Sequence, residues 1–374
     1  MVRLSSRLSS AQVKALEAAV VAAKSAAGAG TGEDELLQFV RDLGAVRTRG
    51  RRVPDRAADA FGLALARMIL DGLLEARGDG PFASGVRAIG SIWVSHQEML
   101  AAARSNPATR LARQALESVH VVAARGPTAV AARLYMHGRR PVTPGVCRSL
   151  PTPAHVLRLL DMDAGSPRAR RVARAWSMAP LPQSTDDWIA WQAVSDRGHW
   201  ENAAITWKLY VCPTREAFRA AFEPSVDCFA CCGASQFKIG AGAFALARPD
   251  KFVAYFGSRD ALVRCIKSLE PLLAKCESHP VPFAAGASSS GIVAWGVDFA
   301  FELAHDEQVS WRWWICERLA RYLCDATSQG ASESAAVDYA LLRLSLDDVS
   351  IETFAPSDRL LLEVAASATQ VPRD

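Results

Sequence analysis

The stretch from Trp207 to Phe256 constrains the fold most, because it carries the pattern of a strand, then a helix, then two more strands. Trp207–Cys212 alternates apolar side chains with Lys208 and Tyr210, which is the period of a half-buried strand. Lys208 and Tyr210 therefore share one face. We expect this segment to lie in the centre of a sheet.

The remainder of this stretch predicts one helix and two strands. Pro213 and Thr214 begin a helix with an apolar stripe that Gly233 ends. The segments Ser235–Ile239 and Lys251–Phe256 follow as strands. Four cationic side chains fall on or beside these strands, and we predict that they form an anion site: Lys208, Lys238, Arg248 and Lys251.

The chain has 374 residues, of which half are apolar and 22% are charged, so it is long enough for two hydrophobic cores. Its fold class is predicted as α+β, with a helical N-terminal half and a C-terminal twisted, mainly antiparallel sheet packed with helices. We predict an N-terminal helix and Gly-rich linker over residues 1–32, a helical domain over 33–200 and an α+β domain over 201–374. The periodic helical segments before the sheet are 9–27, 33–43, 56–77, 84–104, 107–124, 127–136 and 154–160.

After the sheet core, helical periodicity returns over 259–275, 310–326 and 333–344, and a further strand is expected over 291–296. Five tryptophans crowd into a short span before and at the first strand. We expect them to pack the helical half onto the sheet, because aromatic side chains bury large areas. These are Trp176, Trp188, Trp191, Trp200 and Trp207.

Nine cysteines, an odd number in a chain without a signal-peptide pattern, predict reduced thiols and a cytoplasmic protein. No apolar run is long enough to cross a bilayer, so no membrane partner is expected. Cys228, Cys231 and Cys232 would share one side of a helix. Because no second Cys-x-x-Cys or paired histidine follows, we interpret them as buried thiols and predict no metal site.

Several common functions find no support in the sequence. Gly240–Ala245 satisfies a loose dinucleotide fingerprint, but Pro249 and the following strand leave no room for a crossover helix, so we predict no cofactor. The arginines of 47–52 are interpreted as a solvated loop, with contact to an acidic peptide or nucleic acid as an alternative, and those of 168–174 as a solvated helix face. Nucleic acid is disfavoured because no aromatic residues interleave with the arginines of 47–52.

The segments Trp207–Val211, Phe237–Gly240, Arg248–Phe256 and Val281–Phe283, with Trp295 and Gly296, are similar to the Hop-type type III effector family. More distantly they resemble the phosphothreonine lyases and the lyase domains of lanthipeptide synthetases. The resemblance covers about residues 200–325. It implies phosphate elimination from a phosphorylated peptide, which leaves a dehydroamino acid.

Carried over by position, the resemblance makes Lys208 and Lys238 the catalytic cationic pair and puts Tyr210 where the lyases have a histidine that protonates the leaving phosphate. Arg248, Lys251 and Tyr255 are predicted to bind the phosphate or the substrate. The implied partners are a phosphorylated precursor peptide and a peptide kinase. The alternative is a non-catalytic peptide-binding or scaffold protein, or an effector-like protein, that keeps the sheet without the histidine.

Overall fold

The computed structural model describes residues 2–4, 74–76, 107–179, 187–195, 205–299, 310–358 and 360–361. The chain divides into two compact units, residues 1–101 and 102–374. In the first unit, strands β1 (Val2–Leu4) and β2 (Leu74–Ala76) pair antiparallel. The helix predicted over 56–77 was therefore wrong at its end, where pairing with a distant segment overrides local periodicity. The other helices predicted before residue 105 and the arginines of 47–52 lie outside the described residues.

The second unit is built on a seven-stranded sheet in which all neighbouring strands are antiparallel, in the order β3-β4-β6-β7-β5-β9-β8. This confirms the predicted α+β class. The strands are β3 (Trp176–Ala179), β4 (Trp188–Ala193), β5 (Ile205–Val211), β6 (Gln236–Gly240), β7 (Phe252–Phe256), β8 (Ala285–Gly286) and β9 (Val293–Phe299).

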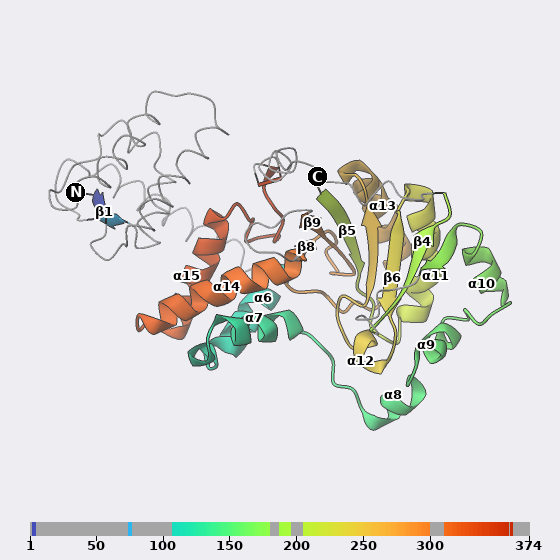
Figure 1. Cartoon of the computed structure of the whole chain (residues 1–374), viewed down its shortest axis with the longest axis horizontal. Coiled ribbons are helices and arrows are strands. Elements are labelled where there is room, and N and C mark those ends of the chain that lie inside the picture. The colour runs from blue at the N-terminus through green and yellow to red at the C-terminus, as the bar shows by residue number, and fades with distance from the viewer. Residues whose placement is uncertain are drawn as a thin grey trace, which may run out of the picture. The chain divides into compact units, whose positions relative to one another are not determined.

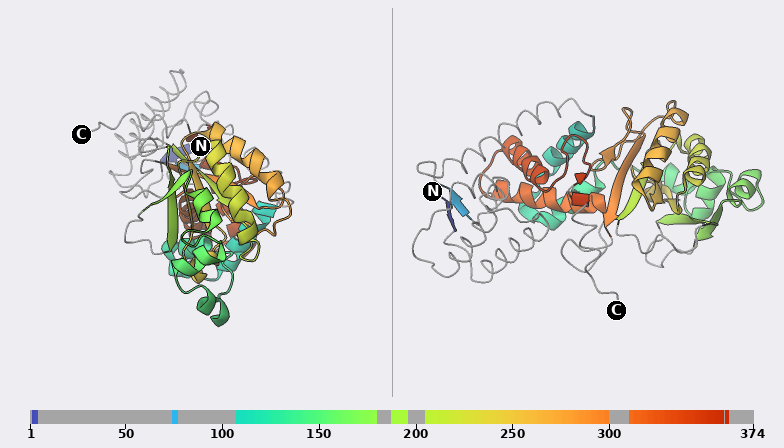
Figure 2. Two further views of the ribbon diagram at one scale, coloured as in Figure 1. Left: turned by 90° about the vertical axis from the view of Figure 1, so that its right-hand side faces the viewer. Right: turned by 90° about the horizontal axis from the view of Figure 1, so that it is seen from above.

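Helices lie on both sides of this sheet (Figures 1 and 2). Helices α11 and α13 lie on one side, and the group of α6, α7, α14 and α15 lies on the other. Of the described helices in this second group, only α14 packs closely on a strand, β9. The helices are α6 (Pro107–His120), α7 (Pro127–Met136), α8 (Pro144–Ser149), α9 (Pro153–Leu159), α10 (Pro167–Val172), α11 (Phe218–Cys232), α12 (Ala243–Leu246), α13 (Arg259–Leu272), α14 (Trp311–Ser328) and α15 (Glu333–Leu346), with a short 3-10 turn at Ala123–Arg125. None of the described helices has the length and apolar character required to cross a membrane.

An aromatic core joins α11 to the sheet. Phe222 and Phe229 of α11 contact Phe237 of β6 and Phe252 of β7, with ring centroids 5.3 to 6.3 Å apart. Trp191 of β4 stacks on Phe237 at 4.7 Å. Because side chains alternate along a strand, burying these rings turns Lys238 and its neighbours to the opposite face.

The tryptophan cluster differs from its prediction. Trp176, Trp188 and Trp191 lie on β3 and β4, inside the segment 33–200 that we predicted to be helical, and the predicted boundary near residue 200 falls between two strands of one sheet. Trp207 lies on β5 as expected and packs against Trp295 of β9. Short turn-bounded strands of Trp and Ala lack clear alternation, which explains why they escaped the sequence pattern. Trp200 lies outside the described residues.

The connection from β6 to β7 joins antiparallel neighbours, so it is not the crossover of a βαβ unit. It contains the four-residue helix α12, which the sequence did not predict. Gly240 makes this turn possible, because a Cβ at that position would lie 2.8 Å from the carbonyl carbon of Ala245 and 3.0 Å from its oxygen. The close return of the chain sets where Arg248 emerges beside the sheet.

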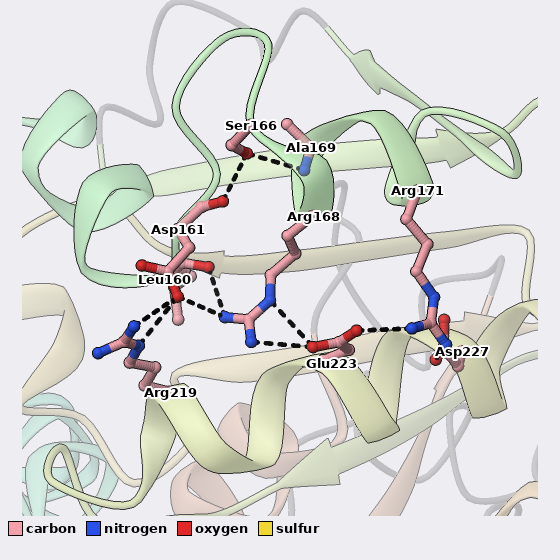
Figure 3. A network of polar contacts seen from close by, with 9 residues as sticks. All are labelled: Leu160, Asp161, Ser166, Arg168, Ala169, Arg171, Arg219, Glu223 and Asp227. Carbon is pink, nitrogen blue, oxygen red and sulfur yellow. Dashed lines mark hydrogen bonds and ion pairs between the residues drawn. The ribbon is translucent and has the colours of Figure 1, made fainter.

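Two of the arginines in 168–174 make specific contacts and are not only part of a solvated face. Arg168 donates to Glu223 at 2.9 and 3.1 Å and to the carbonyl oxygen of Leu160 at 2.7 Å. Arg171 donates to Glu223 at 2.8 Å and to Asp227 at 2.5 Å (Figure 3). These arginines therefore fix α10 against α11.

Candidate functional site

Lys208, Lys238 and Tyr255 come together on the face of the sheet opposite the aromatic core. Lys208 pairs with Tyr255 across β5 and β7, and Lys238 lies one strand further, on β6. The amines of Lys208 and Lys238 lie 5.3 and 5.5 Å from the centre of the Tyr255 ring. The sheet register thus brings the two predicted catalytic lysines to the same aromatic side chain.

Lys208 is buried and forms an ion pair with Asp298 of β9. Burial alone would lower the pKa of Lys208, but the charge of Asp298 and its hydrogen bond outweigh this and raise it. Lys208 is therefore a fixed ammonium ion. It cannot act as a base at neutral pH, but it supplies a permanent positive charge.

Lys238 has the opposite character. Its amine lies 4.5 Å from the centre of the Trp188 ring and makes no hydrogen bond or ion pair with any residue that the structure describes. Burial, helped by the nearby charge of Lys208, lowers the pKa of Lys238 to about 8. A substantial fraction of this amine is thus neutral near physiological pH, as a general base requires.

Arg248 follows α12 in the chain, and its side chain lies next to Trp188, as that of Lys238 does. Its guanidinium lies 5.1 Å from the centre of the Trp188 ring and bonds both oxygens of Asp250 at 2.9 Å. Buried Arg312 of α14 also donates to Asp250, at 2.6 Å. Burial alone would raise the pKa of Asp250, but the two guanidinium groups hold it far below its usual value.

Tyr135 of α7 completes this arrangement. Its hydroxyl accepts from Arg248 at 3.1 Å, and its carbonyl oxygen accepts from Arg312 at 3.0 Å. The site thus holds two carboxylates, Asp250 and Asp298. Around them lie Lys238 and three side chains that stay positively charged: Lys208, Arg248 and Arg312. The excess positive charge suits a bound dianion.

Tyr210 lies on the same face as Lys208 but is buried beneath it, in an apolar cluster with Val253 and Ala294. Burial raises the pKa of Tyr210, although the charge of Lys208 opposes the shift. Burial likewise raises the pKa of Tyr255 well above its normal value. Both phenols are held neutral, so they can donate hydrogen bonds but are poorly suited to releasing a proton.

Lys251 is placed away from the other predicted site residues. It is fully buried and donates to the carbonyl oxygen of Pro213 at 2.7 Å and to Nδ1 of His279 at 3.2 Å. His279 in turn bonds the carbonyl oxygen of Gly138 through Nε2 at 2.5 Å. These contacts give Lys251 a role in joining loops rather than a position at the rim.

A surface pocket of about 480 Å³ lies elsewhere, between α12 and the turn after α8, and none of the six predicted site residues lines it. Lys238, Trp188 and Arg248 are half-buried, whereas Lys208, Tyr210 and Tyr255 are buried. Among the described residues, the accessible part of the cationic group is therefore the Lys238 and Arg248 end. This is where an anion would enter.

Sequence reasoning missed four residues that organise this group: Tyr135, Asp250, Asp298 and Arg312. Asp298 carried a signal, because β9 continues beyond Gly296, where we ended the strand, and Asp298 falls on the alternation that includes Gly296. Arg312 and Tyr135 lie on apolar helices distant in sequence, and no spacing links them to the strands.

The sequence matches no protein-family model, and no curated protein is significantly similar to it. Similar solved structures include an effector protein from Pseudomonas syringae pv. syringae strain 61, which is 10% identical with a TM-score of 0.38 over 67% of this chain and 98% of that one. An effector protein from Pseudomonas syringae pv. tomato strain DC3000 is 12% identical with a TM-score of 0.34 over 65% of this chain and 99% of that one.

The type III effector and phosphothreonine lyase OspF from Shigella flexneri is also similar, at 12% identity and a TM-score of 0.28, over 38% of this chain and 86% of that one. Identities and TM-scores this low transfer neither an activity nor a substrate. The function of this chain therefore has to be argued from its own side chains.

Proposed function

We propose that the chain is a carbon–oxygen lyase that eliminates phosphate from phosphoserine or phosphothreonine in a peptide, with Lys238 as the base. The supporting observation is the contrast between two neighbouring lysines. Lys208 is kept charged by Asp298, whereas burial and that same charge lower the pKa of Lys238 to about 8. A fixed cation beside a neutral amine is what this elimination needs.

The phosphate group would lie between Lys208 and Arg248, near the Trp188 ring. Arg248 is oriented by Asp250 and by the hydroxyl of Tyr135, so its guanidinium is fixed before the substrate arrives. Fixed positive charge stabilises the oxygen on which negative charge develops as the ester bond breaks. The Trp188 ring provides an apolar surface on one side of the Lys238 amine.

The reaction balances without a cofactor. Lys238 takes the proton from Cα, the electron pair of that bond forms the Cα–Cβ double bond, and the Cβ–O bond breaks with its pair on the departing phosphate. The proton taken by Lys238 is then returned to the phosphate, which leaves as hydrogen phosphate. The product is dehydroalanine or dehydrobutyrine in the peptide.

For the substrate we propose a precursor peptide of a ribosomal-peptide modification pathway, phosphorylated by a kinase, as the resemblance to lanthipeptide synthetase lyase domains implies. The chemistry requires only a phosphorylated Ser or Thr whose Cα hydrogen reaches the Lys238 amine. A kinase that supplies the phosphate is thus the implied partner.

A direct test incubates the purified chain with phosphoserine and phosphothreonine peptides and measures released phosphate together with the dehydrated peptide by mass spectrometry. Wild type is expected to yield both products in equal amounts. Lys238→Met and Lys208→Met are expected to yield neither while retaining the circular dichroism spectrum of wild type. The control is Lys267→Met, because Lys267 is exposed on α13, on the other side of the sheet.

One feature favours the non-catalytic alternative. The carboxylate of Asp298 already balances the positive charge of Lys208. A peptide-binding protein of this kind would bind its peptide with equal affinity whether or not the peptide is phosphorylated, and no dehydrated product would form. Calorimetric titration of the two peptide forms separates the alternatives. Equal affinities for the phosphorylated and the unphosphorylated peptide would rule out the lyase proposal.

A further inference from the structure

Three cysteine thiols meet on the other side of the sheet, far from the lysines in the fold. Cys228 and Cys232 lie one turn apart on α11, and Cys265 lies on α13, which packs beside α11. Their sulfur atoms all lie within 4.8 Å of one another, and those of Cys228 and Cys265 are 3.6 Å apart. The proposed elimination uses none of them.

These distances fit coordination by sulfur. A zinc–sulfur bond is about 2.3 Å long, which puts two sulfurs of a tetrahedral site about 3.8 Å apart. The sulfur atoms, which lie within 4.8 Å of one another, therefore need to approach by no more than about 1 Å to bind one ion. The two ligands on α11 have i, i+4 spacing, which points both side chains to the same face of the helix.

The cluster also runs from the interior to the surface. Cys265 is fully buried and Cys228 is nearly so, whereas Cys232 is half-buried and the adjacent Cys231 is exposed. An ion can thus enter past Cys232 and reach the inner thiols. A water molecule that enters from the same side can supply the fourth ligand that tetrahedral Zn²⁺ requires.

From this geometry we propose that Cys228, Cys232 and Cys265 bind a thiophilic metal ion, Zn²⁺ or Cu⁺, as three thiolates. Three sulfur ligands exclude Mg²⁺ and Ca²⁺, which bind oxygen, and select soft or borderline ions. Each thiol gives its proton to solvent as the ion binds, so binding weakens as the pH falls. The bound ion joins α11 to α13 behind the sheet. The sequence alone did not predict the site because its third ligand comes from a separate helix.

The test loads the reduced full-length protein anaerobically with Zn²⁺, and separately with Cu⁺, against a competing chelator. Co²⁺ serves as a spectroscopic probe, because thiolate ligands give it an intense charge-transfer band in the near ultraviolet. We expect one ion per chain and a band that reports three thiolates. Tighter binding of Zn²⁺ would indicate a tetrahedral site completed by water. Tighter binding of Cu⁺ would indicate a trigonal site made of the three thiolates alone.

Cys232→Ser is the main variant, because this half-buried position tolerates a hydroxyl, and we expect its affinity to fall at least tenfold. Cys265→Ser is expected to lose the band, provided that its circular dichroism spectrum matches wild type. Cys276→Ser is the matched control, since Cys276 is equally half-buried and outside the cluster, and it should bind like wild type. Equal affinities for wild type and Cys232→Ser, or the absence of a thiolate band in wild type, would overturn the proposal.

Discussion

Two lysines on neighbouring strands of one sheet differ in charge because their nearest side chains differ. Lys208 has a carboxylate partner, whereas Lys238 is surrounded by the Trp188 and Tyr255 rings and by other cations. The sequence identified both lysines and their shared face. It could not assign their protonation states, because Asp298 and Trp188 lie on strands whose pairing is not encoded locally.

If Lys238 is the base of the proposed elimination, the pH dependence of the rate follows from its pKa. The base must be neutral, so the rate is expected to rise about tenfold per pH unit below about 8 and to level off above it. Initial rates of phosphate release between pH 6 and 10 measure this profile. Lys238→Arg should be at least 100-fold slower at every pH, because a guanidinium stays protonated.

The buried amine of Lys238 is expected to lower the free energy of unfolding at neutral pH. Its folded pKa is lower than its unfolded pKa, so the unfolded state binds more protons between about pH 8 and 10.5 and stability rises with pH in that range. Below about pH 8 the whole penalty is present. Lys238→Met should therefore raise the Tm at pH 7 by roughly a few degrees, and this gain should shrink at pH 10. A Tm gain of equal size at both pH values would contradict the assigned pKa shift.

The Lys208 and Asp298 pair is expected to behave as a buried unit. Asp298→Asn leaves an unpaired buried ammonium ion and should lower the free energy of unfolding by roughly 3–5 kcal/mol. The double variant Lys208→Met with Asp298→Asn should recover most of that loss, because neither charge is then left without its partner. Urea denaturation of the two single variants and the double variant gives the coupling energy, and additive losses would show that the pair does not interact.

At the scale of elements, strong periodicity was a reliable guide. Strands β5, β6 and β7 and helices α13, α14 and α15 all form within a few residues of their predicted ranges, because each has a clear apolar face. Strands β3 and β4 and helix α12 were missed. Strand β3 pairs with β4 and β4 pairs with β6, so their conformation depends on distant segments, and α12 depends on the return of the chain over Gly240.

Gly240 therefore gives a prediction about the β6 to β7 connection. In Gly240→Ala the added methyl would overlap the backbone of Ala245, so the turn must shift, at a cost of roughly 1–3 kcal/mol. Chemical denaturation measures this loss. Gly257→Ala is the matched control, since no atom lies within 4 Å of its added Cβ, and a loss as large as that of Gly240→Ala would indicate a general effect of replacing glycine.

At the scale of the molecule, Asp250 connects the sheet to the helical layer through Arg312 of α14 and orients Arg248 toward the site. Asp250→Asn should destabilise the fold by roughly 3–5 kcal/mol, because the buried guanidinium of Arg312 and the half-buried one of Arg248 lose their counter-charge. The stabilising effect of Asp250 is present above about pH 4, its unfolded pKa, and is lost as the pH falls toward its depressed folded pKa. Thermal unfolding of both proteins at pH 7 and pH 3 checks this, and a stability difference that does not narrow at pH 3 would contradict it.

The contact between Arg312 and Tyr135 spans 177 positions of the chain. On the ribosome, β5, β6 and β7 emerge well before the helix that clamps Asp250 in place. A nascent chain arrested before α14 would thus hold an incomplete cationic surface, in which Asp250 lacks its bond from Arg312. Contacts between segments this far apart in the sequence slow folding, because the entropy of closing the intervening loop is lost before the contact forms.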